Sequence, residues 1–556
     1  MSQTRLARWL LAWAIATAVA CAVVHHAFVL DVDEAHPRVV VASVWRDGAL
    51  LARAVLARAA DRDPRLDAAL SASPGAVRVD ESIVGEGPAL AFAEPVLALS
   101  FVPGRDGMKV TLGDRTEYLT PDDLLARQGY DKGISVPSVQ LQAGVDVPLA
   151  LALLAERFGT SARDLVERAR FRRIRVVRSV PGTPSPRVVT ADDLRDDDVR
   201  EAIAGMARYL ARGVDEQGRF RYLVNAPTNQ TLPGYDWPRH AGATLFLAQA
   251  TALLGDADLG FATLRSASWL RDHALVRCGT HSCIGDDALV DVGSAALATL
   301  AFVEIARTRL DPGYALAVPE LTEFLRSQQR PDGEFMHEYD RATGHPVDVQ
   351  LLYYSGEAVL ALSRAHALLG DARDLDAATR GLAHLVGPAW SFFGSRYYWG
   401  EEHWTCQAMD DLWDRAPSQP ALDFCLGWQA YGRRLMYGPG DSPFDADGAY
   451  GFGPVVTPRL TPVGSRSEAG IATLEAAMRA GRPAAELALL DAQMRRSLAV
   501  LIRHQLHPGP SYLFVDPLAV DGAMPGSAVD WQLRIDYEQH SGCALVRWLA
   551  LRHPHG

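Results

Sequence analysis

Carboxylate, histidine and aromatic side chains recur at the beginnings of six apolar segments in the last two thirds of the chain. Aromatic rings stack on the apolar face of a pyranose, and carboxylates bind sugar hydroxyls and supply acid and base. If the six segments are helices that begin at one common opening, their leading polar residues line a single pocket. Two carboxylates facing each other there would act as general acid and general base, and burial would raise the pKa of the acid.

We select as catalytic candidates four carboxylates and two histidines from these positions: Asp236, Asp348, Glu402, Glu538, His240 and His403. A second set is expected to bind substrate: Trp237, Arg239, Tyr353, Tyr354, Glu357, Tyr398, Trp399, Trp404, Arg466, Tyr537 and His540. The run Tyr397–Trp404 is the densest group of such residues. Each carboxylate taken alone is also typical of a helix cap or a solvated loop.

Cysteine and histidine spacing gives no sign of a metal site. Neither C-x-x-C nor H-x-x-x-H occurs, so we expect no metal and no cofactor. Cys278 and Cys283 bracket a short loop that a disulfide would close in an oxidising compartment, and Cys406 with Cys425 is a second possible pair. The spacing alone leaves the pairing open and one cysteine odd.

Twelve segments with helical periodicity must position these residues, and they form two alternating series. One series is amphipathic and charged: 199–211, 259–275, 318–329, 375–385, 422–435 and 485–501. The other is apolar around most of its circumference: 239–253, 287–307, 351–369, 404–413, 465–479 and 537–551. A helix that is apolar on all sides must be buried on all sides. The pattern therefore predicts a mainly α fold, an α/α toroid of six helical hairpins with six inner and six outer helices.

Short turns repeat between outer and inner segments. Residues 215–220 and 330–335 share an acidic–glycine–Phe core, and residues 445–450 are a weaker copy with Tyr in place of Phe. We interpret them as turns with short β-ribbons, although acidic–glycine pairs are also common turn residues in general.

The region before the toroid has a different character. Residues 39–44, 97–102 and 109–112 read as strands, and 149–157 and 162–170 read as helices. Thr120 and Pro121 are typical of a helix start. We predict a small mixed α/β domain over residues 36–185, which ends at a proline-rich linker, and a toroid domain over residues 190–556.

An apolar, uncharged run follows Arg5 and Arg8 at the amino terminus. Extended over residues 9–30, it is long enough to cross a bilayer, which takes roughly 20 residues, although His25 and His26 interrupt it. The arginines before it and acidic residues after it favour a cytoplasmic amino end. We expect residues 1–30 to be a signal anchor, a single-pass inner-membrane helix with the bulk of the protein in the periplasm. Cleavage after Ala18-Val19-Ala20, lipidation of Cys21 and a buried core helix are the alternatives.

Composition limits the partners. The chain has 556 residues, a formal net charge of −12 and 48% hydrophobic residues, which excludes wholesale disorder and multi-span membrane topology. No stretch is markedly basic, so we expect no nucleic-acid partner.

The alternating helices, with openings such as Tyr353–Ala358 and Trp237–Gly242, resemble the six-hairpin glycosidase superfamily over about residues 190–556. That superfamily includes glycoside hydrolases, uronate-processing enzymes and N-acylglucosamine epimerases, so the resemblance implies a carbohydrate substrate. In the epimerases, histidines and an arginine of the funnel move a proton. Residues of matching type here are Arg239, His240, His403 and His540. Residues 101–125 are faintly similar to the AMMECR-type family but lack its Arg-Gly-Cys-Ile-Gly motif, so no function follows from them.

The sequence therefore favours an exported, membrane-tethered carbohydrate-processing enzyme, glycoside hydrolase-like with carboxylate acid–base chemistry. The alternatives are a sugar epimerase or uronate lyase that uses His, Arg and Tyr, and a non-catalytic scaffold that binds a glycan or a protein. Residues 410–414 also fit the D-D-x-x-D pattern by which prenyl synthases hold magnesium diphosphate. Residues 329–335 resemble a turn of squalene cyclases, but this sequence lacks the D-x-D-D acid motif of those enzymes.

Overall fold

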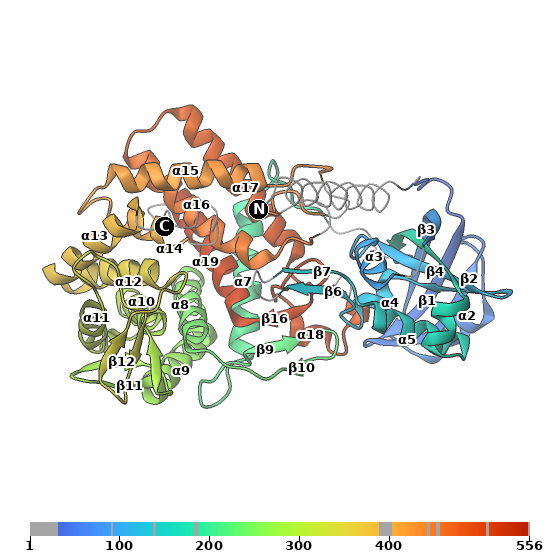
Figure 1. Cartoon of the computed structure of the whole chain (residues 1–556), viewed down its shortest axis with the longest axis horizontal. Helices are drawn as coiled ribbons and strands as arrows, with labels where there is room; N and C mark the ends of the chain where they lie inside the picture. Colours follow the sequence, from blue (N-terminus) through green and yellow to red (C-terminus); the bar gives the residue numbers. More distant parts are fainter. Residues whose placement is uncertain are drawn as a thin grey trace, which may run out of the picture.

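The chain folds into an N-terminal α/β domain and a larger helical domain (Figure 1). The computed structural model describes residues 30, 32–90, 93–136, 141–182, 187–388, 403–441, 445–451, 456–507 and 511–553. Apart from Leu30, the expected signal anchor lies outside the described residues. Among the residues that are described, no helix is long and apolar enough to cross a membrane.

Six helices form a closed inner ring, as the all-round apolar segments predicted. They are α8 (Trp237–Leu254), α10 (Val292–Arg307), α12 (Tyr354–Leu369), α14 (Trp404–Leu412), α16 (Leu460–Arg479) and α19 (Ile535–Arg552). Each packs against the next, and α19 packs back against α8. Glycines at the helix contacts permit this closeness: a Cβ on Gly242 of α8 would overlap the Gln539 amide of α19, and one on Gly542 would overlap Phe246.

Six amphipathic helices surround the ring, each packed against an inner one. They are α7 (Asp196–Arg212), α9 (Ala257–Ala274), α11 (Val318–Ser327), α13 (Ala372–Leu385), α15 (Gln419–Leu435) and α17 (Ala484–His504). All twelve predicted helices are confirmed, and the two largest boundary differences are five residues. Helix α10 begins only at Val292, because Asp291 accepts a hydrogen bond from the Ser294 backbone and caps it. Helix α16 begins at Leu460, earlier than predicted.

The predicted turn repeat is confirmed and has a structural role. Each turn contains a glycine in the left-handed region; these are Gly218, Gly333 and Gly448, with φ of 103°, 95° and 92°. A Cβ there would lie only 2.1–2.5 Å from a backbone oxygen of the next outer helix; these oxygens belong to Arg265, Arg380 and Arg496. Each turn therefore fastens one outer helix to the next.

Short strands connect the hairpins. They are β9 (Leu223–Asn225), β10 (Gln230–Thr231), β11 (Leu275–Cys278), β12 (His281–Ile284), β13 (Leu289–Asp291), β14 (Glu338–Asp340), β15 (His345–Val347) and β16 (Gln532–Arg534). The order β10-β9-β16 ties the chain before α8 to the chain before α19, and β13-β14-β15 ties the chain before α10 to the chain before α12. The sheets thus hold neighbouring inner-helix starts together.

Both candidate disulfides are present. Cys278 of β11 is bonded to Cys283 of β12, and Cys406 of α14 is bonded to Cys425 of α15. Among the described residues, Cys543 is the free cysteine, and it is buried in α19.

The N-terminal domain is built on a six-stranded antiparallel sheet in the order β2-β1-β3-β8-β4-β5. Its strands are β1 (Val39–Arg46), β2 (Ala49–Leu56), β3 (Val77–Leu90), β4 (Asp106–Leu112), β5 (Arg115–Leu119) and β8 (Arg170–Ser179). Its helices are α2 (Pro64–Ala72), α3 (Glu94–Leu99), α4 (Pro121–Leu125), α5 (Val147–Phe158) and α6 (Ala162–Arg168).

One predicted strand in this domain is wrong. Residues 97–102 were expected to be extended, but the segment begins as helix α3, with Pro95 in its first turn. Proline is tolerated there because the first helical N–H groups have no intrahelical acceptor, and a short apolar run does not distinguish a strand from a buried helix. The predicted start at Thr120 is confirmed, with Thr120 and Asp123 forming a capping box.

The N-terminal domain forms hydrogen bonds with the loops that lead into α16 and α19. The hairpin of β6 (Tyr130–Val136) and β7 (Leu141–Val145) extends toward β16 in Figure 1. The buried Asp131 carboxylate accepts hydrogen bonds from the Thr457 hydroxyl (3.0 Å) and the Ser527 hydroxyl (3.2 Å). The Gln128 side-chain oxygen accepts the Trp531 backbone N–H at 3.0 Å. Both Gln128 and Asp131 have positive φ, 54° and 56°, so this contact is held in a strained backbone.

The buried Asp131 should make the free energy of unfolding depend on pH, and Asp131→Asn should remove that dependence. Burial raises its pKa to about 7, against an ordinary value of about 3.9 in an unfolded chain. The folded protein binds this proton more tightly, so the contribution of Asp131 to the free energy of unfolding falls as the pH rises between those two values. We expect Asp131→Asn to gain about 2 kcal/mol relative to the wild type on going from about pH 5 to about pH 8, measured by urea unfolding at each pH. Parallel stability curves for the two proteins would contradict this.

Candidate active site

The inner helices begin at one common mouth, defined here as the end of the ring where their first turns meet. Contacts between these first turns run around the ring. The Trp237 indole N–H donates to Asp286, just before α10, at 2.9 Å. The Arg239 and Asp536 side chains link α8 to α19 at 3.4 Å. A Cβ on Gly293 of α10 would meet Tyr354 of α12 at 2.5 Å.

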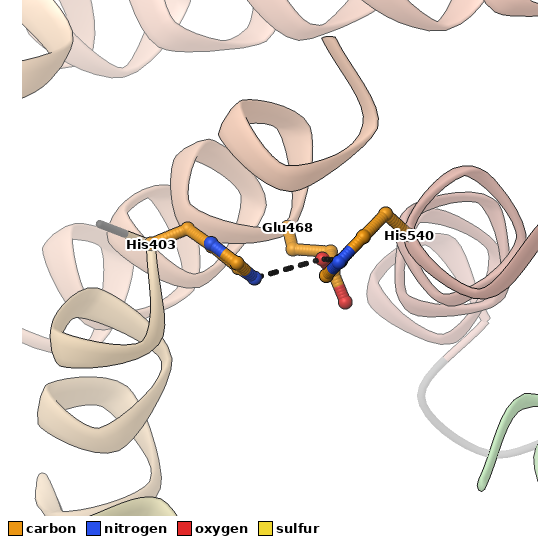
Figure 2. Close-up of side chains that lie close together, drawn as sticks. All are labelled: His403, Glu468 and His540. Atoms are coloured by element: carbon orange, nitrogen blue, oxygen red, sulfur yellow. Dashed lines mark hydrogen bonds and ion pairs between the residues drawn. The ribbon is translucent and has the colours of Figure 1, made fainter. Parts of the chain in front are cut away.

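Two histidines and a glutamate meet in this mouth. His403 precedes α14, Glu468 lies in α16 and His540 lies in α19. The His540 Nδ1 donates to Glu468 Oε2 at 2.8 Å, and His403 Nε2 lies 3.4 Å from the same oxygen. The two imidazole rings are edge to face with centroids 4.9 Å apart. Figure 2 shows the three side chains pointing toward one another from three helices.

Electrostatics couple Glu468 with His540. Glu468 and His403 are buried, whereas the His540 side chain is 14% exposed. Burial raises the pKa of Glu468, and the His540 imidazole, Arg547 and Arg364 oppose that rise. Because the carboxylate fixes the proton of His540 on Nδ1, the other ring nitrogen, Nε2, is left as a base.

A close approach of two backbones creates this cluster. A Cβ on Gly464 would lie 2.8 Å from the Ser541 nitrogen and 2.9 Å from the His540 carbonyl carbon. Glu468 is one helical turn after Gly464 and therefore on the same face of α16. The missing side chain at Gly464 thus brings Glu468 within hydrogen-bond distance of His540.

A second polar layer joins the same three helices deeper in the ring. Asp410 of α14 pairs with Arg547 of α19 and with Arg479 of α16. Arg547 also donates to Glu475 of α16, with Nε 2.9 Å from Oε2. Asp410 and its neighbours are therefore engaged with arginines, which disfavours the interpretation of residues 410–414 as a magnesium diphosphate site.

Two aromatic rings lie beside His403. The Trp404 ring lies 4.4 Å from the His403 ring, and the Tyr353 ring lies 6.3 Å from it, centroid to centroid. Tyr537 accepts a hydrogen bond from Arg459 at 3.1 Å. The Arg466 guanidinium lies over the Tyr450 ring, 4.9 Å from its centroid, and so packs against a repeated turn.

A pocket of about 440 Å³ lies on the other side of the mouth, at the starts of α8, α10 and α12. Its wall includes Trp237, Tyr354, Asp236 and Asp291. Burial raises the pKa of Asp291 to about 6. Glu357 is buried beside it, with Oε2 2.6 Å from where a Gly293 Cβ would lie. The pocket combines aromatic rings with carboxylates, which suits a sugar ring.

Other predicted catalytic residues have structural partners. Asp236 caps α8 and pairs with Arg239. The Asp348 side chain is 60% exposed and pairs with Arg330 at 3.0 Å. Glu538 is buried on the far face of α19, where it accepts the Met524 backbone N–H at 3.0 Å, and burial raises its pKa to about 8.

His240 is a satisfied core histidine. Its Nε2 lies 2.9 Å from the Ser266 carbonyl oxygen, which can only accept, so Nδ1 accepts from the Tyr235 hydroxyl at 2.7 Å. Burial lowers the pKa of His240 to about 4, which keeps it neutral. Glu402, Tyr398 and Trp399 lie outside the described residues.

The sequence places Glu468 and Asp291 among the polar residues at the starts of inner helices, but neither is among the selected catalytic or binding residues. The signal for Glu468 was a carboxylate inside an inner helix that is otherwise apolar and small, where a buried charge needs a partner. The signal for Asp291 was an aspartate followed three residues later by Ser294, a typical helix start.

Several solved structures are similar to the toroid in fold. A D-mannose isomerase matches at a TM-score of 0.48 with 12% identity, over 64% of this chain and 97% of that chain. A sugar epimerase from a ruminal bacterium matches at a TM-score of 0.49 with 12% identity. The GH76A alpha-1,6-mannanase from Salegentibacter sp. HEL1_6 matches at a TM-score of 0.45 with 13% identity. Each of these two matches covers 64% of this chain and 99% of the other. No protein-family model matches the chain, and no curated protein matches its sequence.

Because the helices are so close at Gly464, adding one methyl group there should destabilise the protein. Gly464→Ala places a Cβ against the α19 backbone and forces α16 away from it. We expect a loss of about 1–3 kcal/mol in the free energy of unfolding, because the added group overpacks a tight contact. The measurement is urea unfolding followed by circular dichroism.

The matched control is Gly260→Ala in α9, where the nearest atoms would lie at ordinary contact distances of 3.4 and 3.5 Å. That variant should gain up to about 1 kcal/mol from helix propensity. Equal effects of the two substitutions would contradict the special role of Gly464.

Proposed function

We propose that this protein is a carbohydrate epimerase whose proton-transfer groups are His403 and His540. The observation that carries the proposal is the pair of imidazoles from two inner helices that share the buried Glu468 carboxylate at the mouth of the ring. Two-carboxylate hydrolysis is less well supported, because Asp236, Asp348 and Glu538 have the structural partners described above.

The reaction that these groups suit is inversion of a carbon next to a sugar carbonyl. One imidazole removes the proton from that carbon in the open-chain sugar, and the electron pair moves to the carbonyl oxygen to form an enediolate. The other imidazole returns a proton to the opposite face of the same carbon, and the carbonyl re-forms. Imidazole is the side chain that most often serves as a general base or acid in such steps.

The surrounding residues have matching roles in this proposal. Glu468 holds His540 in one tautomer and stabilises its protonated form. Tyr353, which lies beside His403 and is only partly buried, offers an aromatic face to the sugar ring. The pocket at α8, α10 and α12 would hold a second sugar of an oligosaccharide.

Glycoside hydrolysis is the second candidate, and one observation favours it. Asp291 lines the pocket of about 440 Å³, and its pKa is raised to about 6. A carboxylic acid with a raised pKa is suited to donate a proton to a leaving group, and Asp236, which also lines the pocket, would be the base.

Deuterium uptake separates the two candidates. We expect the full-length protein in D₂O to incorporate one deuterium into the sugar at the carbon beside the carbonyl, measured by mass spectrometry over a panel of aldoses and disaccharides. Glu468→Gln and His540→Gln should lower the rate at least about 100-fold, because each disables proton transfer.

The control is His345→Gln, which alters an exposed histidine of β15 and should leave the rate unchanged. Release of reducing ends without deuterium uptake, abolished by Asp291→Asn and retained in Glu468→Gln, would contradict the epimerase and support the hydrolase. Binding of glycans with neither reaction would support the scaffold.

We also propose that the protein is exported and held at the membrane by residues 9–30. The two disulfides support this, because such bonds persist in oxidising compartments. Cell fractionation should find the full-length protein in the membrane pellet and a variant without residues 1–30 in the soluble fraction. Recovery of the full-length protein from the cytosol with reduced cysteines would contradict the proposal.

A further inference from the structure

The His403, Glu468 and His540 cluster has the donor set of a transition-metal site. We propose that it binds one Zn²⁺ ion and that the bound ion inhibits the enzyme. The inhibition rests on the proton-transfer function proposed above, whereas the binding does not.

The geometry allows one ion to reach all three side chains. One nitrogen or oxygen donor from each side chain lies within 4.8 Å of the other two. The Glu468 oxygen is 2.8 Å from His540 Nδ1 and 3.4 Å from His403 Nε2. Donors at about 2.0–2.2 Å from a tetrahedral Zn²⁺ ion lie roughly 3.4 Å from one another, so small side-chain movements complete the site. Figure 2 shows the three side chains close together.

The chemistry of the donors selects the ion. Two imidazoles and one carboxylate form a ligand set found in zinc enzymes, with one position open for water or a hydroxyl. Ca²⁺ and Mg²⁺ prefer oxygen ligands throughout and are disfavoured here. The ion would also neutralise the charge of the buried Glu468 carboxylate.

Binding competes with protons and therefore with the proposed reaction. The ion would replace the proton between His540 Nδ1 and Glu468 Oε2, so affinity should increase as the pH rises. A coordinated imidazole has no free electron pair on the ligating nitrogen, and a carboxylate bound to the ion no longer holds the His540 tautomer. Zn²⁺ occupancy should therefore stop proton transfer.

Isothermal titration of the full-length, chelator-treated protein with ZnCl₂ tests the site. We expect one equivalent to bind the wild type, and Glu468→Gln and His540→Gln to weaken binding at least about tenfold, since each removes a ligand. His345→Gln is the matched control and should bind as the wild type does. Co²⁺ in place of Zn²⁺ should give visible absorption bands that Glu468→Gln lacks, and circular dichroism checks that each variant is folded.

Unchanged binding in both Glu468→Gln and His540→Gln would overturn the site. Full deuterium uptake by the wild type at saturating Zn²⁺ would overturn the inhibition. A wild type that lacks turnover with and without chelator would count against the proposed epimerase alone, because the titration and the Co²⁺ spectrum still decide the metal site.

Discussion

The hydrogen bond between Glu468 and His540 is the interaction on which the mouth of the ring depends. A carboxylate buried among apolar helices costs several kcal/mol unless it is paired. Here it is paired with an imidazole on the neighbouring helix, across a contact that only glycine permits at position 464. His403 then lies against the same oxygen, so one buried charge gathers residues from three helices into a single unit.

Two further sets of contacts hold the helices and loops that carry His403, Glu468 and His540. Deeper in the ring, Asp410, Arg479 and Arg547 join the same three helices by ion pairs. At the side, the N-terminal domain contacts the loops before α16 and α19 through Asp131 and Gln128. The N-terminal domain therefore contributes to the position of the site residues, beyond acting as a spacer.

The toroid could be predicted because its inner helices carry their signal locally. A segment such as 242–248, with small and apolar residues on every side, has to be buried in any fold. The convergence of His403, Glu468 and His540 could not be predicted, since His540 is 72 positions beyond Glu468 and no local spacing encodes their contact. Glu468 was expected among the leading polar residues of its helix, and the earlier start of α16 places it two turns inside.

The predicted side chains were of the right types, but their partners decided their roles. His240 has the chemistry of a proton carrier, yet its bonds to Ser266 and Tyr235 use both ring nitrogens. Asp348 has the chemistry of a base, yet it lies in an exposed ion pair with Arg330. Such partners come from distant segments, and they become visible only when the chain is folded.

The central claim is that one carboxylate couples two histidines, and long-range ¹H–¹⁵N spectra of the histidine side chains test it most directly. In Glu468→Gln, the imidazole nitrogen resonances of both His403 and His540 should shift from their wild-type positions, while those of His240 stay in place. A spectrum in which His403 keeps its wild-type resonances would show that the three residues do not act as one unit.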